Sequence, residues 1–194
     1  SCGEIDAEDL LDPDPEILSG VLDLTGEPPI TLDDPDGLTP GAQEMIADGN
    51  MGGSSLWSEV FAFEVLARCE GATLLKTETE IVYDTQGKIT DILVEIDGQK
   101  VGVSVTRAVH FPFDQPYTLD EATTLMTRKL SDIHVSTADV SAGDRWVKQI
   151  LSIYAYDQAS ADVAEQAIAG IDAQTRGDTI VLITVSDGDD AFIY

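Results

Sequence analysis

The sequence predicts an α/β protein in which helices flank a mixed central sheet, behind a disordered acidic N-terminal tail. The chain has 194 residues, of which 43% are hydrophobic, and this is enough apolar material for one packed domain with an extension. Helical segments alternate with short segments rich in β-branched residues, which is the order expected of a sheet with helices on its faces. Acidic residues and proline gather in the first fifty positions, whereas every Lys and Arg follows them.

The chain is expected to divide at a Gly-rich joint into a tail or linker at residues 1–53 and an α/β domain at residues 54–194. The first fifty residues hold 14 of the 37 acidic residues and six of the eight prolines. Because proline removes backbone donors and like charges repel each other, few packed elements are expected there. Only the short apolar pieces at residues 17–18 and 21–24 are expected to dock on the domain.

The domain is expected to begin with a buried helix and a three-stranded meander. Residues 55–70 are good helix formers with apolar side chains around most of the helical wheel, and Gly71 is placed to end the helix. The alternating segments that follow predict strands at residues 73–83, 89–96 and 100–107. Asp97-Gly98 is expected to join the last two strands as a hairpin turn.

Helices and strands alternate in the second half of the domain. Thr118 and Glu121 have the spacing of a capping box at the start of a helix over residues 119–134. Ser160 is placed as the N-cap of a later helix. The remaining predicted elements are a strand at 146–156 with a buried helix as the alternative, a helix at 160–171, a strand at the centre of the sheet at 178–185 and a short edge strand at 191–194.

The net charge limits the partners that suit this chain. The 37 acidic residues against 10 Lys and Arg give a net charge of −27. Such a surface repels phosphate backbones and anionic lipid headgroups, so nucleic acid is a disfavoured partner. A protein partner, basic in character, fits better. A secreted or cell-surface location is expected, with a cytoplasmic one as the alternative.

The two cysteines, Cys2 and Cys69, leave three alternatives open. The context Ser1-Cys2-Gly3 is similar to the lipidated N-terminus of a mature bacterial lipoprotein, and a lipid anchor at Cys2 is the one route by which membrane contact is expected. A disulfide between the two cysteines is the second alternative. Two free thiols are the third, because a count of two cannot choose among them.

Acidic side chains lie on the first helix and on the second strand of the predicted meander. The helix carries Glu59 and Glu64, the second strand carries Asp91, and the third strand carries Ser104 and Thr106. This order resembles the core of the PD-(D/E)XK nuclease-like superfamily, in which a helix Glu, an Asp on the second strand and an acid-x-Lys triplet on the third form the site. The third-strand acid and Lys positions fall on Ser104 and Thr106, so both of those family residues are lost here.

The resemblance implies that carboxylates hold a divalent metal while a Lys positions water and stabilises developing charge. The candidate residues are Asp91 with Glu59 as metal ligands, and Glu64 and Glu95 as further catalytic candidates. Glu95 shares a strand face with Asp91. Glu59 and Glu64 lie about 140° apart on the helical wheel, so only one of them can face Asp91. The structural alternatives are Glu59 at the positive end of the helix dipole and Glu64 paired with Arg68 four residues on.

Three functions follow from these observations. The lost acid and Lys favour a non-catalytic binding domain with a nuclease-like fold and a degenerate active site, exported and tethered at its N-terminus. A divergent metal-dependent hydrolase of the same class is the alternative, and a structural protein that self-assembles is the third. No cofactor is required for the first function, whereas Mg²⁺, Mn²⁺ or Ca²⁺ suits the second. Whether the protein is an enzyme is therefore open, with the balance against it.

Overall fold

The computed structural model describes residues 5–25, 35–51, 53–188 and 190–194. The helices are α1 (Pro40–Asp48), α2 (Leu56–Cys69), α3 (Leu119–Asp139), α4 (Gln158–Gly170) and α5 (Ala173–Arg176). The strands are β1 (Ile17–Leu24), β2 (Thr73–Thr77), β3 (Ile92–Ile96), β4 (Gln99–Ala108), β5 (Lys148–Ala155) and β6 (Ile180–Gly188). Two short 3-10 helices, η1 (Asp9–Leu11) and η2 (Ala191–Ile193), complete the described elements.

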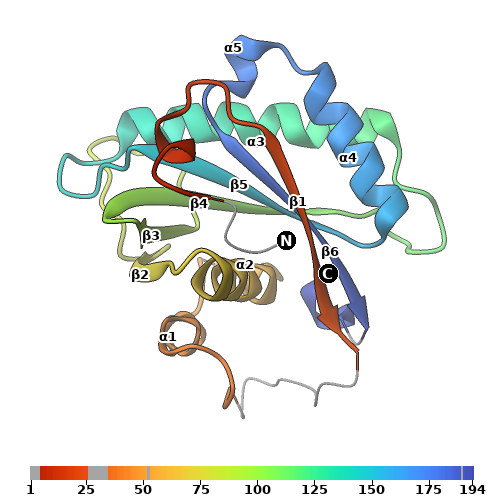
Figure 1. Ribbon diagram of the computed structural model, residues 1–194, viewed down its shortest axis with the longest axis horizontal. Coiled ribbons are helices and arrows are strands. Elements are labelled where there is room, and N and C mark those ends of the chain that lie inside the picture. Colours follow the sequence, from red (N-terminus) through yellow and green to blue (C-terminus); the bar gives the residue numbers. More distant parts are fainter. Residues whose placement is uncertain (1–4, 26–34, 52, 189) are drawn as a thin grey trace.

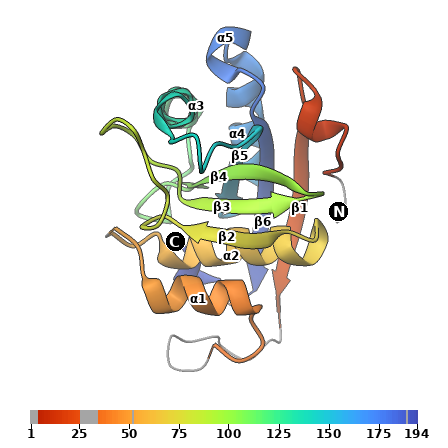
Figure 2. The same ribbon diagram turned by 90° about the vertical axis from the view of Figure 1, so that its left-hand side faces the viewer.

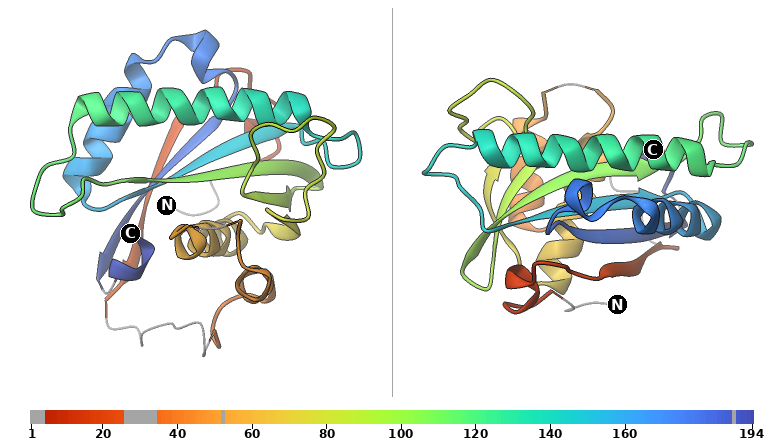
Figure 3. Two further views of the ribbon diagram at one scale, coloured as in Figure 1. Left: turned by 180° about the vertical axis from the view of Figure 1, so that it is seen from behind. Right: turned by 90° about the horizontal axis from the view of Figure 1, so that it is seen from above.

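The described elements form three layers, with one sheet between two layers of helices (Figure 1). The strand order is β1-β6-β5-β4-β3-β2. The strands β2, β3 and β4 are antiparallel, whereas β4, β5, β6 and β1 run parallel. Helix α3 runs along one face with α4 beside it, and α2 covers the other face with α1 outside it (Figures 2 and 3). The predicted mixed sheet flanked by helices is therefore confirmed.

Each face of the sheet has its own hydrophobic core, because successive strand residues point to opposite sides. Val101, Val103 and Val105 of β4 pack toward α2, in one cluster with Val60 and Leu66. The opposite face of β5 and β6 packs against α3 and α4, through residues such as Leu151, Ile153, Val181, Met126 and Leu130. Strands β5 and β6 are covered on both faces, which explains why they read as continuous apolar runs rather than alternating ones. Among the described residues, no helix has the length and hydropathy that a membrane crossing requires.

The N-terminal region contributes packed elements, so the prediction that residues 1–53 form a tail is wrong for β1 and α1. Strand β1 pairs in parallel with β6, from Ile17 opposite Val181 onward, and becomes an edge of the sheet. Helix α1 buries Ala42 and Met45 in the same core as α2. Gly41 makes this approach possible, since a Cβ there would lie 2.6 Å from the Phe63 ring. The docking expected for residues 17–18 and 21–24 is therefore confirmed, and the ladder with β6 explains its stability.

Hydrogen exchange is expected to show protected amides within residues 17–24. The ladder with β6 occupies every second amide of β1, and a hydrogen-bonded amide exchanges only when the strand opens. Exchange measured by NMR or mass spectrometry at neutral pH checks this. Rapid exchange throughout these residues, at the rate of an unstructured peptide, would contradict the pairing.

Several local predictions are also wrong. The strands predicted at 73–83 and 89–96 are shorter, because β2 ends at Thr77 and β3 begins at Ile92, so Asp91 lies just before its strand. Residues 191–194 do not form an edge strand, because η2 packs against α2, with Phe192 5.5 Å from the Trp57 ring and 5.3 Å from the Phe61 ring. Ser160 is not an N-cap, because α4 begins two residues earlier and the Asp157 carboxylate accepts the Ser160 amide at 2.7 Å. The capping box of Thr118 and Glu121 is confirmed at the start of α3.

Candidate metal-binding site at the β3–β4 fork

Strands β3 and β4 separate after the pair Ile92–Val103, and β4 continues alone on that side. We call this place the fork, and it comprises Asp91, Val105, Glu59, Glu78 and Lys129. Asp91 directly precedes β3, and its carboxylate accepts the backbone amide of Val105 at 2.6 Å. This bond replaces the strand pairing that β4 loses there. The Lys129 ammonium of α3 donates to the Val105 carbonyl oxygen at 2.8 Å, so both polar groups of this peptide backbone are used.

The Asp91 carboxyl has a strongly perturbed pKa. The pKa of Asp91 is raised to about 7, chiefly by burial and also by the negative charges of Glu59 and Glu78. Lys129 and the Val105 amide act in the opposite direction. Desolvation penalises the charged form of a carboxyl group, and like charges nearby do the same. The fork therefore holds more negative charge than its own cation neutralises.

Glu59 reaches the fork from α2. Its side chain is only 4% exposed, and burial raises its pKa, followed by the charge of Glu78. Hydrogen bonds from Ser55 and Asn50, together with the charge of Lys129, oppose this shift. Glu59 also lies in the first turn of α2, where the helix dipole favours an acid. Glu59 can therefore both interact favourably with the helix dipole and belong to the fork.

Glu64 lies elsewhere. Its carboxylate contacts the Arg68 guanidinium at 2.6 Å, which is the pairing at four-residue spacing that the sequence predicts. The other oxygen accepts the backbone amide of Thr39 at 2.6 Å and its hydroxyl at 2.5 Å, which ties the start of α1 to α2. Glu64 therefore has a structural role, and Glu59 is the helix carboxylate near Asp91.

Of the other predicted residues, some lie near the fork and one lies far from it. Ser104 and Thr106 are buried on β4, and Ser104 directly follows Val103, the last residue of β4 that pairs with β3. Glu95 is exposed at the far end of β3, opposite Lys100. Glu95 lies four positions after Asp91 along an extended strand, a distance of about 13 Å. The fork therefore includes Asp91 and Glu59 but not Glu95.

Sequence reasoning missed Lys129 and Glu78. Lys129 belongs to α3, and Glu78 to the turn after β2, where its carboxylate accepts the Met51 amide at 2.8 Å. On the helical wheel, Lys129 lies beside the buried Met126 and Leu130, at the edge of the apolar face. That position is a sequence signal for a partly buried cation. It does not indicate which groups the ammonium contacts.

The mutation Lys129→Met is expected to raise the pKa of Asp91 further, because the ammonium is the strongest influence that lowers it. The pKa is measured by following the Asp91 carboxyl carbon by NMR across a pH titration. Lys88→Met is the matched control, since Lys88 pairs with Asp132 at 3.2 Å and is not among the main groups that shift the pKa of Asp91. An unchanged Asp91 titration in Lys129→Met would show that the two charges do not interact.

An open cleft of about 580 Å³ is lined by Thr106 and Arg128, which are the chain neighbours of Val105 and Lys129, although no fork residue itself lines it. Two cations, Arg107 and Arg128, line it together with exposed aromatic rings such as Phe111 and Phe113. Arg107 is held by the carbonyl oxygens of Ser54 and Ile193, at 3.2 and 3.4 Å. Two of the ten basic residues of this acidic chain thus line this cleft.

A second group of carboxylates lies on the surface. Oxygen atoms of Glu44, Asp48 and Glu80 are all within 4.8 Å of one another, and all three residues are exposed. Such clusters attract cations loosely in solution. The exposed cluster matters here as a source of background in metal titrations.

Cys69 is disulfide-bonded at the end of α2. The other cysteine of the chain is Cys2, which lies outside the described residues, as does the predicted lipid anchor there. The backbone amide of Ile5 donates to the Glu70 carboxylate at 2.9 Å. Ile5 therefore lies close to Glu70, the residue that follows Cys69.

No protein-family model matches the chain. The chain is 39% identical over 152 residues to the AAC-rich mRNA clone AAC4 protein of Dictyostelium discoideum; the match covers 75% of this chain and 22% of that protein. The chain thus spans about a fifth of this curated relative. Among solved structures it is similar to SfsA of Pyrococcus furiosus in complex with Ca²⁺, with 13% identity and a TM-score of 0.31, over 69% of this chain and 57% of that one.

Proposed function

We propose that the fork binds a divalent cation and that the domain is a divergent metal-dependent hydrolase. The observation that carries this proposal is the position of Lys129. It supplies from α3 an ammonium group in place of the lysine that position 106 of β4, a Thr, does not provide, and it lies close enough to Asp91 and Glu59 to lower the pKa of both carboxyls. The nuclease-like resemblance requires carboxylates and a lysine in one place, and three different elements bring them together here.

The donor set suits a hard cation. Asp91 and Glu59 would hold Mg²⁺ or Mn²⁺, because these ions prefer carboxylate oxygen, and Glu78 adds negative charge nearby. The ion would supply an activated water molecule and polarise the bond to be cleaved. Lys129, fixed at 2.8 Å from the Val105 carbonyl, would stabilise negative charge that develops on the substrate. Ser104 and Thr106 offer neutral hydroxyl groups only.

The surroundings favour a small anionic substrate. Arg107 and Arg128 give the adjoining cleft a local positive charge. The net charge of −27 repels a long polyanion, since its remote phosphates would meet acidic surface. A small phosphoester, which contacts only the cleft and the fork, satisfies both conditions.

Calorimetric titration of Mn²⁺ into the full chain tests the cation site. The full chain is needed because β1 and α1 belong to the packed domain. One stoichiometric site is expected, and it should be lost in Asp91→Asn. Glu95→Gln should keep it, because this mutation removes an exposed carboxylate four strand positions away from Asp91. Glu44→Gln identifies heat that comes from the exposed surface cluster. Equal binding in Asp91→Asn and Glu95→Gln would overturn the proposal.

Hydrolysis of bis(p-nitrophenyl) phosphate in the presence of Mn²⁺ tests the chemistry. Lys129→Met is expected to lower kcat by about 100-fold, which is typical of removing one group that stabilises transition-state charge. Lys88→Met serves as the control and should retain activity. Mn²⁺ binding without turnover would support the cation site and contradict the proposed hydrolase activity.

The second candidate is a non-catalytic binding domain, and a specific observation favours it. Neutral Ser104 and Thr106 occupy the positions of the family acid and lysine, and the Lys129 ammonium is already engaged by the Val105 carbonyl. The acidic surface would then bind a basic protein. Absence of turnover, combined with salt-sensitive capture of a basic partner, would favour this candidate.

A further inference from the structure

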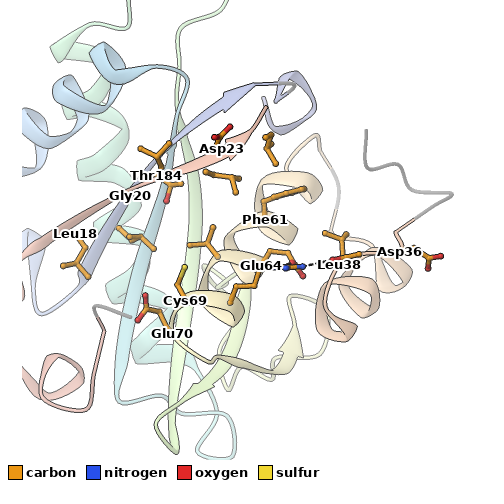
Figure 4. A pocket seen from close by; sticks show the side chains of 17 residues that line it. Leu18, Gly20, Asp23, Asp36, Leu38, Phe61, Glu64, Cys69, Glu70 and Thr184 are labelled. Atoms are coloured by element: carbon orange, nitrogen blue, oxygen red, sulfur yellow. Dashed lines mark hydrogen bonds and ion pairs between the residues drawn. The ribbon is translucent and has the colours of Figure 1, made fainter. Parts of the chain in front are cut away.

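A cavity of about 450 Å³ lies between the β1–β6 edge of the sheet and α2. Figure 4 shows Leu18 and Gly20 of β1 on one side, and Phe61 and Glu64 of α2 on the other. Its volume falls in the range of small-molecule sites. None of the fork residues Asp91, Glu78 or Lys129 lines it, so the cavity is separate from the proposed cation site.

The interior of the cavity is apolar. Its walls include six large hydrophobic side chains from β1, α2, and β6: Leu18, Leu22, Leu24, Phe61, Val65 and Leu182. Leu18, Leu22 and Val65 are only partly buried. An aliphatic chain placed there would cover this apolar surface and gain about 25 cal/mol for each Å² removed from water.

The charges around the cavity are acidic. Among the described residues, four carboxylates and one guanidinium line it, a net charge of −3. The Arg68 guanidinium already contacts Glu64 at 2.6 Å and the Gly37 carbonyl at 2.6 Å, so its charge is internally paired. Asp23 and Asp36 are exposed at the surface beside the cavity. Hydrogen bonds from Thr25 lower the pKa of Asp23, so this carboxyl is ionised at neutral pH.

We infer that this cavity binds a single-chain amphipathic cation, with the aliphatic chain between β1 and α2 and the cationic group beside Asp23. The apolar walls match the chain, and the excess of carboxylates matches the charge. An anionic amphiphile of the same length meets the same walls but is repelled by the surrounding acids. This inference is independent of the proposed function, because it requires neither Asp91 nor a metal ion.

Calorimetry of the full chain with decyltrimethylammonium below its micelle concentration tests the inference, and decanoate is the matched anion. We expect saturable binding at one site, at least 10-fold tighter for the cation. Val65→Trp and Leu18→Trp should abolish binding by filling the cavity from α2 and from β1. Val82→Trp is the control, because Val82 is 53% exposed and lines no part of the cavity. Circular dichroism establishes that each variant is folded.

Asp23→Asn distinguishes the contribution of the Asp23 charge to binding from that of the apolar cavity walls. It is expected to weaken binding of decyltrimethylammonium several-fold while leaving binding of neutral decanol unchanged. Equal affinity for decanoate would overturn the choice of a cation. Binding that persists in both tryptophan variants, or that shows many weak sites lost at high salt, would mean attraction to the acidic surface rather than occupation of the cavity.

Discussion

Asp91→Asn is expected to raise the free energy of unfolding at pH 8 by up to about 4 kcal/mol and to leave it unchanged at pH 4. Burial raises the pKa of Asp91 from its ordinary value of 3.8 to about 7. The folded protein therefore binds this proton more tightly than the unfolded chain does. The stability that this provides is complete below the unfolded pKa and is lost as the pH rises toward 7. Asn avoids this loss because it cannot ionise, and its side-chain oxygen still accepts the Val105 amide.

Urea unfolding at pH 4, 6 and 8 measures this difference. Glu95→Gln is the matched control, because Glu95 is exposed and should show the pH dependence of the wild type. Saturating Mn²⁺ should stabilise the wild type at pH 8 more than Asp91→Asn, since a bound cation favours the ionised carboxylate. Equal stabilities of wild type and Asp91→Asn at all three pH values would show that the Asp91 carboxyl is not perturbed.

Reduction of the disulfide at Cys69 is expected to lower the free energy of unfolding by about 2–4 kcal/mol. We expect Cys2 to be its partner. Ile5 lies against Glu70, next to Cys69, and three extended residues reach about 10 Å, which is far enough for Cys2 to meet Cys69. A cross-link between such distant positions restricts the unfolded chain and thereby stabilises the folded one.

Peptide mapping without reductant identifies the partner, and urea unfolding with and without reductant measures the effect. Cys69→Ser is the control, because its stability should not respond to reductant. A persistent disulfide also supports an extracellular location, since reducing compartments keep thiols free. Alkylation of Cys69 without reductant would contradict the cross-link. A lipid-modified Cys2 in the N-terminal peptide would restore the anchor hypothesis and exclude this pairing.

Much of the fold was predictable from the sequence because its signals are local. The meander, the hairpin turn at Asp97-Gly98 and the capping box at Thr118 each depend on residues only a few positions apart. Positive φ angles at Asp97 and Gly98 are what a tight hairpin turn requires. The Glu64–Arg68 pair is equally local, since four residues make one helical turn.

The sequence by itself determined the α/β class, the positions of its main helices and strands, and the candidacy of Asp91. Only the tertiary structure decided that residues 17–24 complete the sheet, because their pairing partner β6 lies more than 150 positions away. Only packing decided that Glu59, rather than Glu64, faces Asp91. It also decided that Lys129 of α3 lies close enough to Asp91 to lower its pKa. These residues come from separate elements, and the electrostatics of a buried site depend on distances in space, which no local pattern in the chain encodes.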